Sequence, residues 1–200
     1  MSSASQETPA PSGQSQSQNQ RPASEAIPYK GPPLPNVVED LIVPNILPTP
    51  LPSFSTVDAD ERVWVPQAPD IDFRPLIFSV SQGYFVNLLR VRRSGILSRH
   101  RHTGPVHAVT LKGRWHYLEH AWWANEGGYS YEPSGDIHTL EVPDGVDEMI
   151  TLFHVTGAYV YVDPDGKALG IEDVFSKLQS AREHYERVGL GADYANQFIR

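Results

Sequence analysis

The 200-residue sequence contains no cysteine. It therefore cannot form a disulfide, a thiolate metal site or a cysteine nucleophile. It also lacks any apolar run near the roughly 18 residues that a membrane span requires, so we expect no membrane insertion. The N-terminus shows neither a basic region followed by an apolar stretch nor an Arg-rich amphipathic pattern, and we therefore expect a cytoplasmic protein.

Basic residues are also scarce. Lys and Arg number 16 against 24 Asp and Glu, which gives a formal net charge of −8. A nucleic-acid surface would need a basic patch, so we expect no nucleic-acid partner. With 40% hydrophobic residues the chain can bury a substantial core, and its length suggests one domain with a tail.

The N-terminal quarter differs in composition from the rest. Residues 1–30 are rich in Ser, Gln and Pro, and we expect them to be disordered because they offer little apolar surface to offset the entropy of ordering. Residues 31–56 form a proline-rich arm in which prolines forbid a long helix. Apolar residues between these prolines suggest that the arm lies against the domain.

Residues 57–166 have the sequence pattern of an all-β domain. Short runs rich in Val, Ile, Phe, Tyr and Leu alternate with turn signals containing Gly, Pro, Asn or Asp, a pattern typical of a sandwich or barrel. The expected strands are Arg62–Val65, Asp70–Val80, Tyr84–Arg93, Ile96–His102, Val106–Leu111, Arg114–His120, Tyr129–Glu132, Ile137–Val142, Met149–Val155 and Ala158–Val162.

The spacing of the apolar residues changes over residues 167–200. Apolar residues from Ile171 to Val188 recur at helical spacing, and Gly189 is a residue at which a helix would end. We expect one amphipathic helix packed on the barrel, with His184 facing solvent, followed by a docking tail that contains Tyr194 and Phe198.

Three histidines suggest a metal site. His100 and His102 are two residues apart, so in a strand both imidazoles project from one face. Two neutral imidazoles on one face make half of a transition-metal site. We expect the third ligand to be His138, which follows a Pro133-x-Gly135 turn into the next strand.

The spacing around these histidines resembles the two motifs of the cupin superfamily. Gly95-x4-His100-x-His102, followed by Gly113, resembles the first motif, and Gly127-x5-Pro133-x-Gly135-x2-His138 resembles the second. The resemblance implies a single cupin β-barrel, that is, a double-stranded β-helix or jelly roll.

One position departs from the cupin pattern. Most metal cupins carry a glutamate shortly after the second histidine, but counting back from Gly113 places Val106 there, and counting forward from His102 places His107 there. The site is then either a triad of His100, His102 and His138 or a four-histidine site that includes His107. Neighbouring residues of a strand face opposite ways, so only one of residues 106 and 107 can face the metal.

A narrower resemblance extends through the segments 100–120, 131–140, 149–155 and 189–194. These are similar to the 2,4′-dihydroxyacetophenone dioxygenase-like proteins, which are grouped with ChrR-like and acetylacetone-cleaving cupins. The resemblance implies a non-haem Fe(II) dioxygenase that uses O2 to split a carbon–carbon bond beside the carbonyl of a hydroxyketone or β-dicarbonyl. Imidazole ligands would also suit Zn, Mn, Ni, Co or Cu.

Several alternatives remain open from the residues. Glu119 and His107 are candidates for a general base or for a partner that orients a ligand. The protein could instead be a regulatory cupin that holds zinc or a small ligand without turnover, as ChrR-like anti-sigma factors do, or a metal-dependent isomerase. We also expect a homodimer or homotetramer.

Overall fold

The computed structural model describes residues 28–32, 40–44 and 60–200. The expected disordered tail up to residue 27 and most of the proline-rich arm lie outside the described residues. The elements are β1 (Leu41–Val43), η2 (Glu61–Val63), β2 (Val65–Ala68), β3 (Ile71–Ser79), β4 (Tyr84–Val91), β5 (Gly95–His102), β6 (Val106–Lys112), β7 (Arg114–Tyr117), β8 (Ala124–Asn125), β9 (Tyr129–Glu132), β10 (Ile137–Val142), β11 (Met149–Thr156), β12 (Tyr159–Val162), β13 (Ala168–Glu172), α1 (Val174–Arg187) and η3 (Ala192–Phe198).

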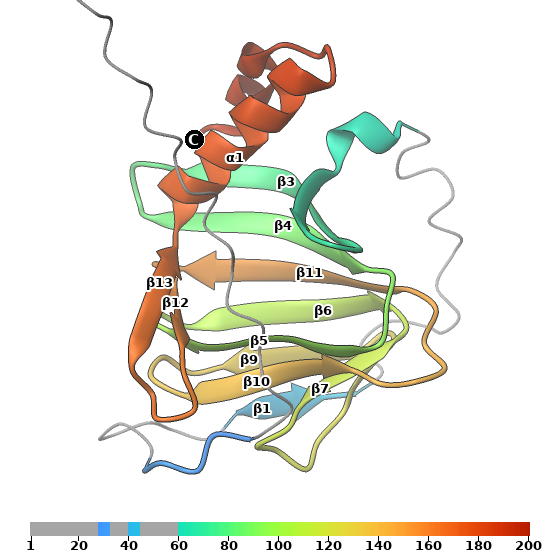
Figure 1. Cartoon of the computed structure of the whole chain (residues 1–200), viewed down its shortest axis with the longest axis vertical. Helices are drawn as coiled ribbons and strands as arrows, with labels where there is room; N and C mark the ends of the chain where they lie inside the picture. Colours follow the sequence, from blue (N-terminus) through green and yellow to red (C-terminus); the bar gives the residue numbers. More distant parts are fainter. Residues whose placement is uncertain (1–27, 33–39, 45–59) are drawn as a thin grey trace, which may run out of the picture.

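The strands form two sheets that pack into an all-β barrel (Figure 1). One sheet has the order β1-β9-β6-β11-β4-β3-β2, and the other has the order β13-β12-β5-β10-β7-β8. Alternating strand residues point inward and build the core, as the period of two requires. The largest fully buried side chains include Trp115, Tyr117, Phe73, Phe78, Phe85 and Met149. The expected all-β barrel is thus confirmed.

Most observed strands follow the expected ones, but several elements differ, among them β1 and β8, which were not expected. Residues 61–63 form a turn of 3-10 helix rather than the start of a strand. Residues 168–172 form β13, which pairs with β12 and extends the β region beyond its expected end. Ile171 and Glu172 therefore belong to a strand, and the helix starts only at Val174.

The start of α1 is fixed by a capping box. The Asp173 carboxylate accepts hydrogen bonds from the amides of Phe175 and Ser176, and the Ser176 hydroxyl accepts one from the Asp173 amide. Asp at the N-cap satisfies amide groups that have no partner within the helix. Gly189 follows the helix with a positive φ of 78°, a conformation that glycine adopts without strain.

Helix α1 packs its apolar side on β2 and β3, as Figure 1 shows beside β3. Val174, Leu178, Ala181 and Tyr185 are buried there. His184 is also buried, and its Nε2 donates to the Arg62 carbonyl at 2.9 Å, so the expectation that it faces solvent was wrong.

The chain after α1 returns to the barrel. Its last residues pair with β3: the Arg200 amide donates to the Phe78 carbonyl, and the rings of Phe78 and Phe198 meet edge to face. The segment therefore docks as its aromatic residues suggested. Across the described residues, no helix is both long and apolar enough to cross a bilayer.

Candidate metal centre

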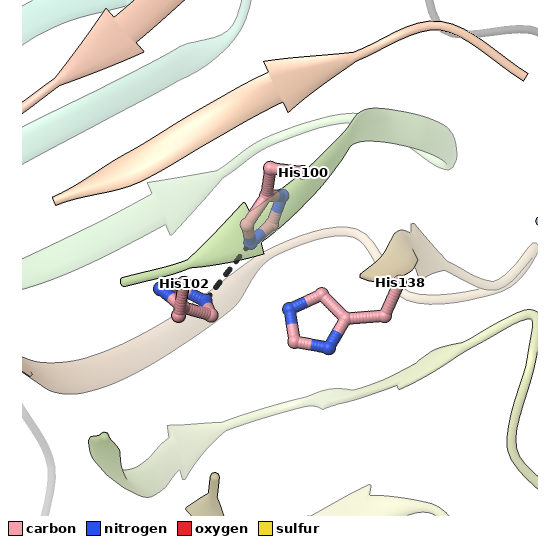
Figure 2. Close-up of side chains that lie close together, drawn as sticks. All are labelled: His100, His102 and His138. Atoms are coloured by element: carbon pink, nitrogen blue, oxygen red, sulfur yellow. Dashed lines mark hydrogen bonds between the residues drawn. The ribbon is translucent and has the colours of Figure 1, made fainter. Parts of the chain in front are cut away.

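Three histidines converge inside the barrel (Figure 2). His100 and His102 lie on β5, and His138 lies on the neighbouring β10 directly opposite His100. All three are buried, with His138 fully so. The spacing of two on β5 and the antiparallel register with β10 place the three rings on one inward face.

The ligand nitrogens of the triad lie within 4.8 Å of one another. The Nε2 atoms of His100 and His102 are 3.1 Å apart, and the ring centroids of His100 and His138 are 4.7 Å apart. Nitrogens about 2.1 Å from a common ion would be separated by about 3 Å, so the triad can hold one divalent cation after small ring movements.

Other side chains hold two of the three rings, those of His100 and His138, by their second nitrogen. Ser98 Oγ lies 3.0 Å from Nδ1 of His100, and Asp136 Oδ2 lies 3.3 Å from Nδ1 of His138. With its proton on Nδ1, His138 keeps Nε2 free to act as a ligand. Tyr117 stacks on His138 at a centroid distance of 3.6 Å, which fixes the plane of the ring.

Burial determines the charge state of the β5 imidazoles. It lowers the pKa of His100 and of His102 well below the usual value of 6.5, and the neighbouring histidines act in the same direction. Both rings are therefore neutral at pH 7, which is the form that binds a transition metal.

A carboxylate lies beside the triad, contrary to our expectation that none would. The Glu132 Oε2 atom is 3.3 Å from His102 Nε2 and 3.8 Å from His138 Nε2. Glu132 is fully buried on β9, and its other hydrogen-bond partner is the Tyr117 hydroxyl, which donates at 2.8 Å. Burial raises the pKa of Glu132 above 4.5 and raises the pKa of Tyr117 well above 10.

Strand pairing explains where this carboxylate comes from. Val106, at the position where cupins usually carry the glutamate, pairs directly with Glu132 across β6 and β9. Opposite residues of an antiparallel pair point to the same side of the sheet. The carboxylate is thus supplied from the next strand of the same sheet, and it reaches the same interior space.

His107 does not join the triad. Val106 is fully buried, and His107 therefore faces the other side of β6. There its Nδ1 lies 2.6 Å from the Tyr129 hydroxyl, and its ring lies beside those of Tyr131 and His154. The four-histidine alternative is incompatible with this position, and so is a role for His107 as base.

Glu119 also lies elsewhere. Its Oε2 accepts a hydrogen bond from the Thr139 amide at 2.6 Å, and its Oε1 accepts from the Thr139 hydroxyl and the Tyr29 amide at 2.8 Å. These bonds hold the residue after His138 and the segment 28–32. The carboxylate is used structurally, so the expectation of a base at Glu119 does not fit the structure.

A second polar cluster lies behind His138. His120 Nε2 is 2.8 Å from Asp136 Oδ2 and 3.4 Å from Asp40 Oδ2. The indole of Trp122 donates to the same Asp40 oxygen at 3.1 Å. Burial raises the pKa of Asp136, but its hydrogen bonds to His120 and His138 outweigh burial and hold that pKa well below its usual value. The bond to Asp136 in turn raises the pKa of His120.

Sequence reasoning assigned no role to Glu132, Asp136 or Asp40. Glu132 and Asp136 flank the Pro133-x-Gly135 turn that delivers His138, and this proximity was the available signal. Asp40 gave no such signal, because its proximity to His120 depends on how the arm folds back. Burial raises the pKa of Asp40 to about 6.

A cavity of about 360 Å³ opens beside the triad. His100, His102 and Tyr117 form one part of its wall, and most of the remainder is apolar. The other lining residues include Ile71, Phe85, Asn87, Leu89, Leu97, Leu140, Phe153, Val155, Tyr159, Tyr161 and Lys177. A small organic molecule would fit here with one end against the histidines.

The donor atoms fit a metal ion. Nε2 of His138 and Oε1 of Glu132 are buried, and neither has a hydrogen-bond partner in the described part of the chain. Buried polar atoms are rarely left unsatisfied, and a cation between these groups would satisfy them. Three imidazoles and a carboxylate suit a divalent ion such as Fe(II), Zn or Mn.

The fold and the buried histidine triad define a cupin. A family model described as the ChrR Cupin-like domain matches residues 53–160, more than half of the chain. The chain belongs to this family. No curated protein matches it.

Solved structures support the same fold. An RmlC-like cupin protein from Ralstonia eutropha JMP134 shares 27% identity with a TM-score of 0.59, over 63% of this chain and 83% of that chain. A protein of unknown function with a cupin-like fold from the same organism shares 29% identity with a TM-score of 0.57, over 60% and 75%. An acetylacetone dioxygenase from Acinetobacter johnsonii shares 16% identity with a TM-score of 0.56, over 64% and 90%, a likeness that concerns the fold alone.

Proposed function

We propose that this protein is a non-haem Fe(II) dioxygenase that cleaves a carbon–carbon bond beside a carbonyl. The observation that carries the proposal is the buried triad of His100, His102 and His138, of which His100 and His102 line a mostly apolar cavity. The sequence resemblance to 2,4′-dihydroxyacetophenone dioxygenases supports this type of reaction, and the fold is one that an acetylacetone dioxygenase also has.

The three histidines and Glu132 would hold the ion, which when bound would supply Lewis acidity and the ability to react with O2. Glu132 has a second use as a proton acceptor. Burial raises its pKa, so that its carboxylate, when not bound to the ion, would be a stronger base than an exposed one for the proton that a hydroxyketone or β-dicarbonyl loses on enolisation. Tyr117 donates to the same carboxylate and orients it.

The cavity favours a small substrate with an apolar or aromatic body. Phe85, Leu89, Phe153 and Tyr159 would contact that body, and these side chains would exclude water from the reacting carbons. Asn87 is one of the polar residues in this wall: it is buried on β4, and its amide makes no side-chain hydrogen bond within the described ranges. It can bind one polar substituent of the substrate.

A second candidate is a regulatory cupin that holds zinc without turnover. The ChrR Cupin-like domain model favours it, as does the complete burial of His138 and Glu132. The cavity argues for turnover instead, because a structural zinc site needs no space for an organic molecule beside its ligands.

Oxygen uptake separates the two candidates. The protein is prepared without added metal, its native metal content is measured, and it is loaded anaerobically with Fe(II) or with Zn²⁺. Uptake of O2 is then followed with 2-hydroxyacetophenones and β-diketones. We expect uptake and carboxylic acid products with Fe(II) only. The same Fe(II)-loaded preparation of His102→Ala is the control, and uptake that persists in this variant, or is absent across the panel in the wild type, would count against a dioxygenase at this site.

A further inference from the structure

The described part of the N-terminal arm, residues 40–44, reaches the candidate metal centre in the folded chain. Strand β1 (Leu41–Val43) pairs with β9, the strand that carries Glu132, and Leu41 lies opposite Tyr131. Figure 1 shows β1 at the edge of the barrel near β9 and β10. The residue just before β1, Asp40, is carried by this pairing to the cluster behind His138.

Asp40 places a buried charge in this cluster. Its side chain is only 3% exposed, and its Oδ2 is 3.4 Å from His120 Nε2. The same His120 nitrogen is 2.8 Å from Asp136, and Asp136 in turn contacts Nδ1 of the ligand His138. A continuous series of polar contacts therefore runs from the arm to a metal ligand.

These groups act as positioning contacts. His120, Asp136 and His138 also have ligand atoms within 4.8 Å of one another, but the 2.8 Å distance from His120 to Asp136 is that of an N–H···O hydrogen bond. Carboxylates behind a ligating histidine fix its orientation and increase its basicity. A buried aspartate near the centre also attracts a cation with little screening by solvent.

A second piece of the N-terminal segment docks close by. The Tyr29 amide donates to Glu119, whose other oxygen accepts from the Thr139 amide, next to His138. One described piece of the segment before residue 60 thus contacts Glu119, which holds the residue after His138, and the other pairs with β9, the strand that carries Glu132. The arrangement makes Asp40 part of the surroundings of the centre.

We propose that Asp40 is a positioning residue for the metal ligand His138, so that docking of the N-terminal arm and binding of the metal are energetically linked. The proposal rests on the metal centre of the proposed function but not on its reaction with O2. Linkage is reciprocal: if the docked arm strengthens metal binding, the bound metal must stabilise the docked arm by the same factor.

Zn²⁺ is a suitable probe because it binds the same ligand types without redox chemistry. Its affinity for the full chain is measured against a competing chelator, for the wild type and for Asp40→Asn. We expect Asp40→Asn to bind Zn²⁺ about 10-fold more weakly, the lower limit typical for partners of metal-bound histidines. Asp144→Asn makes the same chemical change at an exposed turn and should leave the affinity unchanged.

The reciprocal effect is measured by hydrogen exchange of the peptide that contains residues 40–44. We expect Zn²⁺ to slow exchange of the β1 amides in the wild type and in Asp144→Asn, and to have much less effect in Asp40→Asn. If Asp40→Asn does not fold, Trp122→Phe replaces it, because that change removes the donor to Asp40 and retains an aromatic ring.

Equal Zn²⁺ affinity in the wild type and in Asp40→Asn would overturn the proposal. So would hydrogen exchange of the β1 amides that is the same with and without Zn²⁺ in the wild type. Both measurements are made without O2 or substrate. A protein that shows the linkage but never consumes O2 would therefore disprove the dioxygenase and leave the role of Asp40 intact.

Discussion

Glu132 is the residue on which the chemistry of the centre depends most. It lies 3.3 Å from His102 and pairs with Val106, so the carboxylate of this chain is displaced by one strand from its usual cupin position. A carboxylate changes the net charge of the ligand set from zero to −1. This difference determines how strongly the centre holds a divalent ion.

Replacing Glu132 tests that role. We expect Glu132→Gln, which keeps the shape and removes the charge, to weaken binding of Zn²⁺ or Fe(II) by about 10- to 100-fold, as measured by competition with a chelator. The double variant Val106→Glu/Glu132→Val should recover part of the affinity that Glu132→Val loses, because residues 106 and 132 face the same interior space. Unchanged affinity in Glu132→Gln would show that the carboxylate does not act on the metal.

Asn87 tests the proposed substrate class. Its buried amide lines a cavity whose wall is mostly apolar, and one hydrogen bond to a substrate is worth about 0.5–1.5 kcal/mol, or roughly 2- to 12-fold in affinity. We expect Asn87→Leu to raise KM by about this factor for a 2-hydroxyacetophenone with a ring hydroxyl, with kcat little changed. The analogue without the ring hydroxyl should be unaffected. Equal losses for both compounds would mean that Asn87 does not recognise the substituent.

At the scale of elements, the strands were predictable because they are short runs rich in Val, Ile, Leu and aromatic residues, and turn residues such as glycine or proline separate them. The triad was predictable for the same reason: the spacing of His100 and His102 and the Pro-x-Gly turn before His138 are local features. Strand β13 was not predictable, because Ile171 fits a period of two as well as a helical period.

The remainder of the site depends on pairing between distant segments. Glu132 contacts the histidines only because of the way the two sheets face each other, and Asp40 contacts His120 only because β1 adds to β9. No local pattern encodes either contact. The same limit explains why Glu119 was misassigned. A glutamate at this position of the sequence could be a catalytic base, but in the fold both of its oxygens accept hydrogen bonds from Thr139 and Tyr29.

Helix α1 should make the fold sensitive to mild acid through His184. Burial lowers the pKa of His184 below 6.5, its value in the unfolded chain. Below pH 6.5 the unfolded state therefore binds more protons than the folded state at this site, and stability is lost as the pH falls. We expect His184→Gln to lose less stability than the wild type between pH 7.5 and 5.5.

Urea unfolding at both pH values measures this effect, with the two proteins compared in the same metal state. The wild type carries the acid sensitivity of His100 and His102 as well, whose pKa values are also lowered by burial. The variant retains these two histidines, so the comparison isolates His184. An identical loss of stability in both proteins would show that His184 can be protonated without cost to the fold.

At the scale of the whole molecule, the centre joins the two sheets. His100, His102 and His138 belong to the sheet that contains β5 and β10, whereas Glu132 belongs to the sheet that contains β9. An ion bound by all four side chains would therefore hold the two halves of the barrel together. A ligand that binds only the folded state stabilises it by about 2.7 kcal/mol at 100 times its Kd.

For a chain of this size, that free energy corresponds to a rise in Tm of about 5 to 10 °C. We expect Zn²⁺ to produce such a rise in the wild type, measured by circular dichroism against protein treated with a chelator, and none in His138→Ala. Glu132→Val should show a smaller rise, since three ligands remain but all of them lie in one sheet. If His138→Ala were stabilised as much as the wild type, the ion would have to bind elsewhere, because no other inward histidine lies on β10 to replace His138.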